Sequence, residues 1–143
     1  MPANALLKGM NAVHRVILFV SRGRAGWQVG PMPVVELTTT GRKSGQQRTV
    51  LLTSPVQEGG SIVLVASRGG DDFHPAWYLN LCANPRVTVS VKGGPAETMI
   101  ARTASADERA RWWPDVVKAY RGYESYQNKT TREIPLVVLT RAE

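Results

Sequence analysis

The sequence predicts a mainly β domain in which an antiparallel sheet closes into a barrel, with a few short helices outside it. About six segments are rich in β-branched residues or alternate apolar with polar residues, as strands do. Most of these segments are joined by short glycine-containing turns, which favours antiparallel neighbours. The chain has 143 residues, 43% of them hydrophobic, which fits one domain with a real core over residues 1–143.

The expected strands follow one another with little chain between them. Residues 34–40 and 47–53 flank the turn Gly41–Gly45 and predict a hairpin. Further strands are expected at 61–67, 86–92, about 96–103 and 134–140. Pro135 places the last strand at a sheet edge or at its own first residue, because proline has no N–H to donate to a neighbouring strand.

Three helical regions are expected. Residues 4–20 place apolar side chains at spacings of three and four with basic residues off that stripe, which predicts an amphipathic basic helix within residues 1–22. This helix either packs on the barrel domain, residues 30–143, or lies on a membrane surface. Residues 75–83 predict a short helix with Pro75 in its first turn. Ser105 and Glu108 form a capping box for a third helix, which Pro114 should kink or divide.

The net charge of +7 is concentrated in the first 60 residues, which hold seven basic and two acidic side chains. Such a distribution indicates an anionic partner: nucleic acid, a membrane surface or an acidic ligand. Nucleic acid is disfavoured, because the expected strands carry no Phe, Tyr or Trp on which bases stack. The single cysteine, Cys82, excludes an internal disulfide and is expected to be buried and inert. With no signal-peptide pattern, this predicts a cytoplasmic protein.

Several familiar chemistries are missing from the sequence. The basic run at Gly41–Gly45 lacks the spacing of a nucleotide-triphosphate loop, and no dinucleotide-binding glycine pattern follows a strand. Cys82, His14 and His74 are too few for a structural zinc site, so no metal is predicted.

The first constellation with chemical meaning is the turn Thr40–Arg48. Its two glycines let the backbone turn sharply and approach a ligand closely. Arg42, Lys43 and Arg48 add positive charge, and Ser44 adds a donor, which suits phosphate or carboxylate groups. The alternative is an ordinary solvated hairpin tip.

The second constellation is Ala66–Gly70, followed by His74–Asn80. A strand end, a glycine loop and a helix start bring free N–H groups together, which favours the polar edge of a ligand. Trp77 and Asn80 lie three residues apart and share a helix face. Trp77 also fits simple core packing, whereas a buried amide at Asn80 needs partners.

The third constellation is a set of tyrosines at spacing three: Tyr120, Tyr123 and Tyr126. On one helix face they would line an aromatic-binding pocket and offer phenol donors. A core-facing aromatic stripe is the alternative. Taken together, the three constellations suit a large cofactor with a planar head and an anionic tail, but they do not identify it.

Five segments carry a resemblance to a known family: Thr39–Gly45, Ala66–Gly70, His74–Asn80, Asn84-Pro85 and Thr131–Pro135. In this order and spacing, over about residues 30–140, the chain resembles the deazaflavin (F420)-dependent nitroreductases of actinobacteria, the F420H2-dependent quinone reductase group. The resemblance implies a split β-barrel and coenzyme F420 as the cofactor. It also implies hydride transfer from F420H2 to a small oxidised acceptor: a quinone, a nitroaromatic or an activated enone.

The resemblance also implies roles for particular residues. The phosphate and oligoglutamate tail would be held by Thr40, Gly41, Arg42, Lys43, Ser44 and Arg48. The deazaflavin edge would meet backbone groups of Ala66, Ser67, Arg68, Gly69 and Gly70. The cofactor pocket would be shaped by Pro75, Trp77 and Asn80. The acceptor site would be lined by Tyr120, Tyr123 and Tyr126. From the chemistry of hydride transfer we expect one tyrosine or a water to donate a proton or to stabilise developing negative charge, and Tyr126 is the tyrosine we select. Arg68, Asp71 and Asp72 depart from the expected pattern.

Other interpretations stay open from the sequence. One is a split-barrel oxidoreductase that uses FMN, although Arg42, Lys43 and Arg48 are more charge than one phosphate needs. Another is a carrier or sensor that binds F420 without catalysis. Pairing into a homodimer and peripheral association with the cytoplasmic face of a membrane are also left open.

Overall fold

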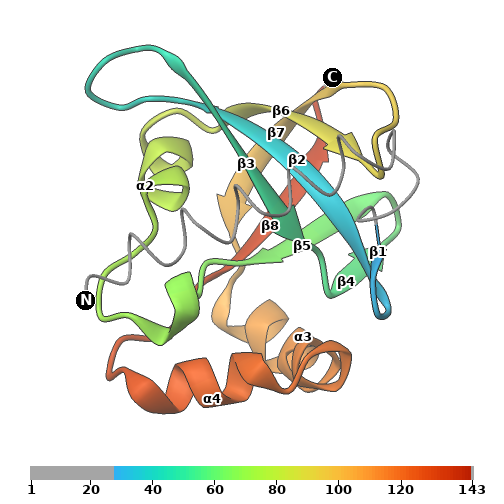
Figure 1. Ribbon diagram of the computed structural model, residues 1–143, viewed down its shortest axis with the longest axis vertical. Coiled ribbons are helices and arrows are strands. Elements are labelled where there is room, and N and C mark those ends of the chain that lie inside the picture. The colour runs from blue at the N-terminus through green and yellow to red at the C-terminus, as the bar shows by residue number, and fades with distance from the viewer. Residues whose placement is uncertain (1–27, 143) are drawn as a thin grey trace.

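The computed structural model describes residues 28–142, so the helix expected at 4–20 lies outside the described residues. Within this range the strands are β1 (Gln28–Val29), β2 (Met32–Thr40), β3 (Gln47–Thr53), β4 (Val56–Glu58), β5 (Ser61–Val65), β6 (Arg86–Val91), β7 (Glu97–Thr103) and β8 (Leu136–Arg141). The helices are the 3-10 turn η1 (Arg68–Gly70), α2 (Ala76–Ala83), α3 (Ala106–Ala119) and α4 (Gly122–Lys129). Figure 1 shows α3 and α4 together on one side of the sheet and α2 at one end.

The strands form one curled antiparallel sheet. Their order is β1-β2-β6-β7-β8-β5-β4, and β3 pairs with β2 outside this path. Every described pairing is antiparallel. No pairing among the described strands joins β3 to β4, so the sheet stays open there. The architecture is therefore a split rather than a closed barrel, mainly β with helices around it, as the resemblance implied.

Of the two positions predicted from Pro135, the sheet edge is wrong and the start of the strand is close to what the structure has. The last strand, β8, is not an edge strand, because it lies between β5 and β7. Pro135 instead directly precedes it, where its missing N–H disrupts no pairing, and its carbonyl accepts a hydrogen bond from Ala66 N at 3.0 Å. The sequence also missed β1 and β4, which are two and three residues long and too short to show an alternation.

The core lies on both faces of the sheet. One cluster fills the curl and includes Trp77 and Leu81 of α2. The other lies under α3 and α4 and includes Trp112 and Tyr123. Neighbouring residues of β5 and β8 point alternately into the two clusters, so both strands are buried on both faces. This explains why their sequences are continuous apolar runs rather than alternating ones.

Helix α3 begins as expected and continues further than expected. Ser105 Oγ accepts from Glu108 N at 3.2 Å, and the Glu108 carboxylate accepts from Ser105 N at 2.9 Å, which confirms the capping box. The Arg102 guanidinium and the backbone N–H of Ser105 lower the pKa of Glu108 to about 2. The predicted interruption at Pro114 is wrong: the helix is continuous, because the cap and the buried Trp112 and Val116 offset the lost hydrogen bond.

Helix α2 differs from its prediction in two details. Pro75 is the residue that caps the helix, with extended backbone, rather than part of its first turn. Cys82 is exposed rather than buried. The buried face of α2 consists of Trp77, Asn80 and Leu81, and the residue after Leu81 is rotated about 100° away from it.

Candidate cofactor and acceptor site

The hairpin tip between β2 and β3 presents unpaired positive charge. Gly45 has φ of +73°, and its N–H donates to Gly41 O at 2.8 Å, which closes a tight turn. Arg42, Lys43 and Arg48 are all exposed. None of the ion pairs between described residues involves these three cations. The tip therefore has charge available for an anionic ligand.

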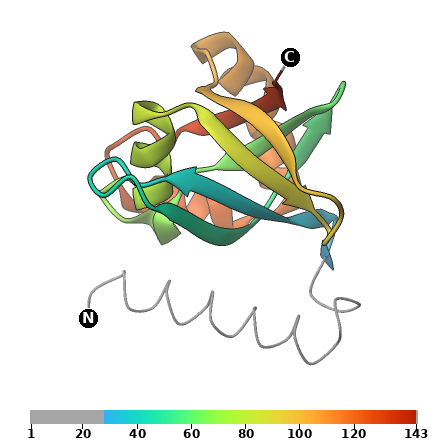
Figure 2. The same cartoon turned by 90° about the horizontal axis from the view of Figure 1, so that it is seen from above.

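Asn80 joins the hairpin tip to α2. Its Oδ1 accepts from Arg42 N at 3.2 Å and from Arg42 Nη1 at 2.9 Å, and its Nδ2 donates to Thr39 Oγ1 at 3.2 Å. Asn80 is 4% exposed, so this amide has the partners that burial demands. Figure 2 shows the tip beside α2 at one end of the sheet. Asn80 thus fixes the tip, and it sets the direction of Arg42.

The glycine loop after β5 holds an unusual backbone conformation. Ser67 lies in the right-handed helical region, and Arg68, Gly69 and Gly70 follow with φ of +48°, +66° and +84°. A right-handed residue followed by left-handed ones aims successive N–H groups to one side and makes an anion-binding nest. The N–H groups of Ser67, Arg68 and Gly69 have no partner among the described residues. The loop therefore offers donors as the resemblance requires.

The acids that depart from the family pattern are both engaged. Asp71 pairs with Arg68 at 3.7 Å, so the side chain of Arg68 is largely neutralised. Asp72 Oδ1 accepts from Thr130 Oγ1 at 2.7 Å. Neither carboxylate is left unpartnered to repel an anionic ligand.

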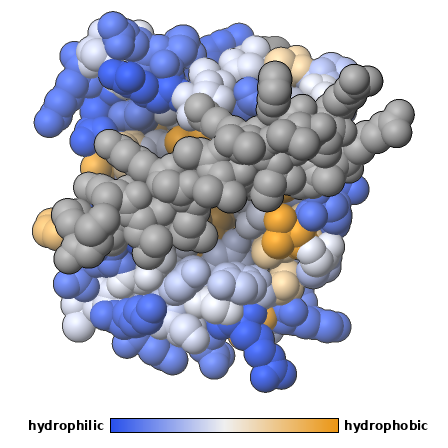
Figure 3. Space-filling view, in the orientation of Figure 1, coloured by the Kyte–Doolittle hydropathy of each residue, from blue (hydrophilic) through white to orange (hydrophobic). Residues whose placement is uncertain are grey.

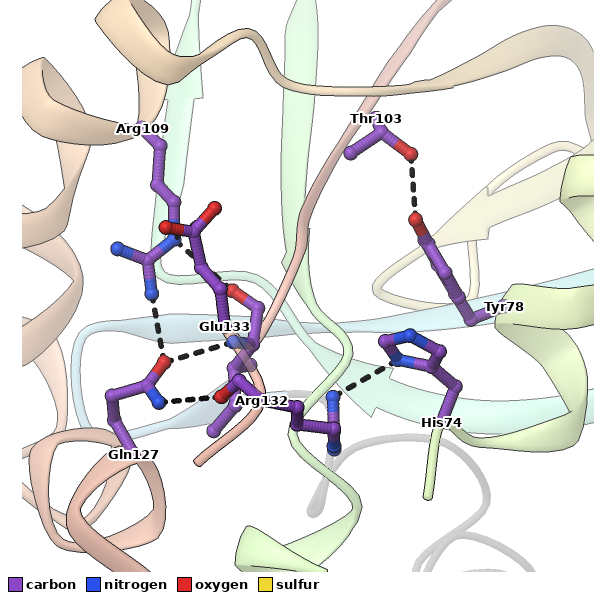
Figure 4. A network of polar contacts seen from close by, with 8 residues as sticks. His74, Tyr78, Thr103, Arg109, Gln127, Arg132 and Glu133 are labelled. Atoms are coloured by element: carbon purple, nitrogen blue, oxygen red, sulfur yellow. Dashed lines mark hydrogen bonds and ion pairs between the residues drawn. The ribbon is translucent and has the colours of Figure 1, made fainter. Parts of the chain in front are cut away.

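Arg132 and Gln127 hold this region together, and sequence reasoning gave neither a role. The Arg132 guanidinium contacts three carbonyls of the segment 66–71 and the ring of His74. Gln127 binds the main chain on both sides of Glu133, through Arg132 O at 2.7 Å and Ile134 N at 2.8 Å (Figure 4). The segment Thr131–Pro135 contributed to the resemblance, but nothing local indicates partners more than 60 residues away.

The tyrosines occupy two helices. Tyr120 caps the end of α3, and Tyr123 and Tyr126 belong to α4, so the expectation of one shared helix face is wrong: the chain leaves α3 at Tyr120. Their rings still cluster, with centroids between 5.1 and 6.3 Å apart. Tyr123 is 7% exposed, and its Oη lies 3.2 Å from Thr53 Oγ1. Burial raises its pKa.

Tyr126 is better placed for chemistry than Tyr123. It is half-buried, and its Oη lies 3.3 Å from Tyr120 Oη. The hydrogen bond with Tyr120, followed by burial, raises the pKa of Tyr126 to about 12. The phenol therefore stays protonated at neutral pH and can donate a hydrogen bond.

Gly70 brings the second and third constellations into contact. A Cβ at this position would lie 2.8 Å from Tyr126 O and 2.9 Å from Tyr126 Cα. Only glycine lets the loop pack this closely on α4. Trp77, 8% exposed, belongs instead to the core cluster that fills the curl, and Pro75 is buried. In the described part of the chain, the glycine loop therefore contacts the helix of Tyr126, and the hairpin tip contacts α2.

In the face shown in Figure 3, hydrophilic side chains cover most of the coloured surface, with small hydrophobic patches between them. No helix among the described residues is long and apolar enough to cross a membrane.

The fold and the site define a split-barrel protein that binds a cofactor with an anionic part. The model of the family described as F420H(2)-dependent quinone reductase matches residues 13–141. An F420H(2)-dependent quinone reductase of Mycobacterium tuberculosis strain H37Rv is 39% identical over 134 residues, 90% of this chain and 88% of that protein. The chain therefore belongs to the F420H2-dependent quinone reductase family. Members of this family are oxidoreductases that depend on reduced F420.

Solved structures agree with this assignment. An F420H2-dependent reductase has a TM-score of 0.67 and 44% identity, over 75% of this chain and 93% of that one. A structure described as a domain-swapped dimer has a TM-score of 0.66 and 40% identity, over 90% of this chain and 96% of that one. A heme-binding protein of Mycobacterium smegmatis, at 20% identity and a TM-score of 0.55, shares the fold alone.

Proposed function

We propose that this chain reduces a small quinone-type acceptor with F420H2, and that the junction of the glycine loop with α4 is where the two reactants meet. The observation that carries the proposal is the packing of Gly70 on Tyr126. It places the loop whose N–H groups have no partner among the described residues against the helix that carries Tyr126. The cofactor needs N–H donors at the polar edge of its ring, and the acceptor needs a phenol where its negative charge develops.

Different residues of the chain would hold different parts of the cofactor. Lys43 and Arg48 have no acid partner among the described residues and would hold the phosphate and glutamate tail. Arg42 would add a charge already oriented by Asn80. The N–H groups of Ser67 to Gly69 would donate to the polar edge of the ring. When bound, the reduced deazaflavin supplies a hydride, and the protein supplies position and electrostatics.

The two outer tyrosines serve the acceptor. Tyr126 Oη holds a proton at neutral pH and would donate it, or a hydrogen bond, to the acceptor oxygen that becomes negative. Tyr120, at 3.3 Å, orients that hydroxyl. Tyr123 is hydrogen-bonded to Thr53 and belongs to the core, so its contribution is to support the other two rings.

The first test is a titration of the purified protein with F420, followed by tryptophan quenching, with FMN in parallel. Binding of F420 but not FMN supports the proposal, and binding of FMN alone replaces it with a flavin enzyme. Turnover of F420H2 with a soluble naphthoquinone then separates an enzyme from a carrier. Tyr126→Phe should lower kcat about 100-fold or more if the phenol transfers a proton. Full turnover by this variant at saturating quinone would refute that role.

We propose further that the protein works in the cytoplasm at a membrane surface and pairs with a second copy. The basic amphipathic pattern of residues 4–20 supports the first part, and the similar structure described as a domain-swapped dimer supports the second. Full-length protein should bind anionic vesicles more tightly than a variant that starts at residue 21. Light scattering gives the oligomeric state, and a monomer at micromolar concentration would contradict pairing.

A further inference from the structure

Most hydrogen bonds of the Arg132 guanidinium are to backbone carbonyls of the glycine loop and its two ends. Nη2 donates to Ala66 O at 3.2 Å and Ser67 O at 2.9 Å, and Nε donates to Asp71 O at 2.8 Å. Nη1 lies 3.0 Å from His74 Nδ1, which must accept because a guanidinium has no lone pair to offer (Figure 4). These contacts use four of its five N–H groups, at both ends of the loop.

Because of the geometry of the peptide bond, these contacts also fix the direction of the nest N–H groups. The C=O of Ala66 and the N–H of Ser67 belong to one planar peptide unit, and in a trans unit they point in opposite directions. The C=O of Ser67 and the N–H of Arg68 are related in the same way. There are no cis peptide bonds in the described chain. By holding both carbonyls on its own side, Arg132 directs two nest N–H groups to the other side.

Arg132 is itself anchored to the end of α4. Its N–H donates to Thr130 Oγ1 at 3.3 Å, and its carbonyl accepts from Gln127 Nε2 at 2.7 Å. Gln127 directly follows Tyr126 in α4. The same arginine therefore ties the loop that carries the free donors to the helix that carries the phenol.

The loop needs such support because its backbone is costly. Arg68 has φ of +48°, a left-handed conformation that costs a side-chain-bearing residue about 1 kcal/mol or more. A strained conformation persists only where its surroundings hold it in place. The Arg132 guanidinium binds the carbonyls of Ala66 and Ser67, which precede Arg68, and the carbonyl of Asp71, which follows it.

We infer that Arg132 is a positioning residue for the cofactor: its planar fork sets the peptide units of the glycine loop so that they donate to the deazaflavin edge, and it keeps that loop in register with α4. The inference rests on the proposed function for the identity of the ligand. The placement of the loop by Arg132 concerns the protein alone and can be tested separately.

Arg109 provides a matched control. Its guanidinium donates to Ile134 O at 3.1 Å and to Gln127 Oε1 at 2.9 Å. It thus supports the same segment of chain as Arg132 and is also half-buried, but it does not contact the glycine loop. Replacement of either arginine by lysine keeps the charge and removes the fork.

The decisive experiment compares Arg132→Lys with Arg109→Lys in the full chain. In the protein without ligand, amide exchange at Gly70 and Asp71, which donate to Ser67 O and Arg68 O, should accelerate in Arg132→Lys only. The Kd for F420 should rise about tenfold in Arg132→Lys and less than about threefold in Arg109→Lys, since charge-assisted hydrogen bonds are lost at the loop in one case only. The rise should persist at high salt, because the charge is unchanged.

Thr130→Val is a milder second variant, for use if Arg132→Lys does not fold. It loosens the backbone anchor of Arg132 while leaving the guanidinium in place, so amide exchange should accelerate at the same positions to a smaller extent. Because the variant also removes the partner of Asp72, the exchange rates rather than the Kd decide the outcome for it. Unchanged exchange at Gly70 and Asp71, or equal losses of affinity in both lysine variants, would overturn the positioning role. If the wild type does not bind F420, the proposed function fails, and the exchange measurement on free protein still decides whether Arg132 sets the loop.

Discussion

The hairpin tip (the turn Gly41–Gly45 together with Arg48 near the start of β3) and the glycine loop (Ser67–Gly70) are both suited to an anionic or polar ligand but are built differently. The tip is exposed, and its cations have no acid partner among the described residues. In the loop, the side chain of Arg68 is paired with Asp71, and the ligand-facing groups are peptide N–H groups held from behind by Arg132. The tip therefore attracts through charge, which salt screens, and the loop selects through geometry, which salt affects little.

Replacement of the buried glycine should show the largest effect. Gly70→Ala places a Cβ 2.8 Å from Tyr126 O, where backbone must move, in addition to a φ of +84°. Gly45→Ala in the hairpin tip carries a similar φ, +73°, with nothing within 4 Å. Urea unfolding should give a loss of about 3 kcal/mol for Gly70→Ala and about 1 kcal/mol for Gly45→Ala. Equal losses would mean that the loop is not packed on α4 and that the contrast with the tip is false.

Removal of charge from the tip should show the second largest effect. The double variant Lys43→Ala with Arg48→Ala should weaken F420 binding about tenfold in low salt, because two exposed charges each contribute up to about 1 kcal/mol. At about 1 M salt the difference should largely vanish. Lys118→Ala, an exposed cation of α3, is the control and should leave the Kd unchanged. If the loss of F420 affinity did not depend on salt, the tip would bind through geometry rather than through charge.

Loss of the link between tip and α2 should cost less. Asn80→Ala removes three hydrogen bonds of a buried amide and should lower the free energy of unfolding by about 1–2 kcal/mol. Asn128→Ala, an exposed position of α4, should change it by less than about 0.5 kcal/mol. The F420 Kd of Asn80→Ala should also rise, because Arg42 loses its fixed direction. An unchanged Kd would show that the cofactor does not use Arg42.

Local pattern predicted what is local in this structure. The strand β3 has its predicted bounds because a glycine turn precedes a run of β-branched and aliphatic residues, and the capping box of α3 is complete within four residues. Pro114 was misjudged because its cost is offset by Trp112 and Val116, whose burial is tertiary. The exposure of Cys82 likewise depends on which face of α2 meets the sheet.

For the candidate site, sequence identified the groups but not the contacts that hold them. The glycines of the loop and the cations of the tip are visible as residue types. The hold of Arg132 on Ser67 spans 65 positions, and the bond of Asn80 to Arg42 spans 38. Spacing patterns reach only a few residues, so such partners emerge only when the sheet brings them together. The same limit hid the difference between tip and loop.

The smallest effect on stability is expected from the contact between Arg132 and His74, which depends on pH. His74 Nδ1 accepts from Arg132, so this contact exists only while the imidazole is neutral. Partial burial, followed by the nearby Arg132 charge, lowers the pKa of His74 below its ordinary 6.5. Above pH 6.5 both folded and unfolded chains hold it neutral, and the contribution to stability is complete. As the pH falls, the unfolded chain takes up the proton first, so stability is lost down to the folded pKa.

Unfolding free energy should therefore fall from pH 7 toward pH 5 more steeply in the wild type than in His74→Asn. An asparagine Oδ1 can accept from Arg132 and does not titrate, and both proteins keep His14, so the difference between the curves reports on position 74 alone. The gap between the two curves should be small, because His74 is only one of several partners of the Arg132 guanidinium. The hairpin tip has no such contact among the described residues, so acid should loosen the glycine loop first, with faster amide exchange at Gly70 than at Gly45. Parallel curves for the two proteins would mean that His74 merely lies beside Arg132 and that the loop is held by its carbonyls alone.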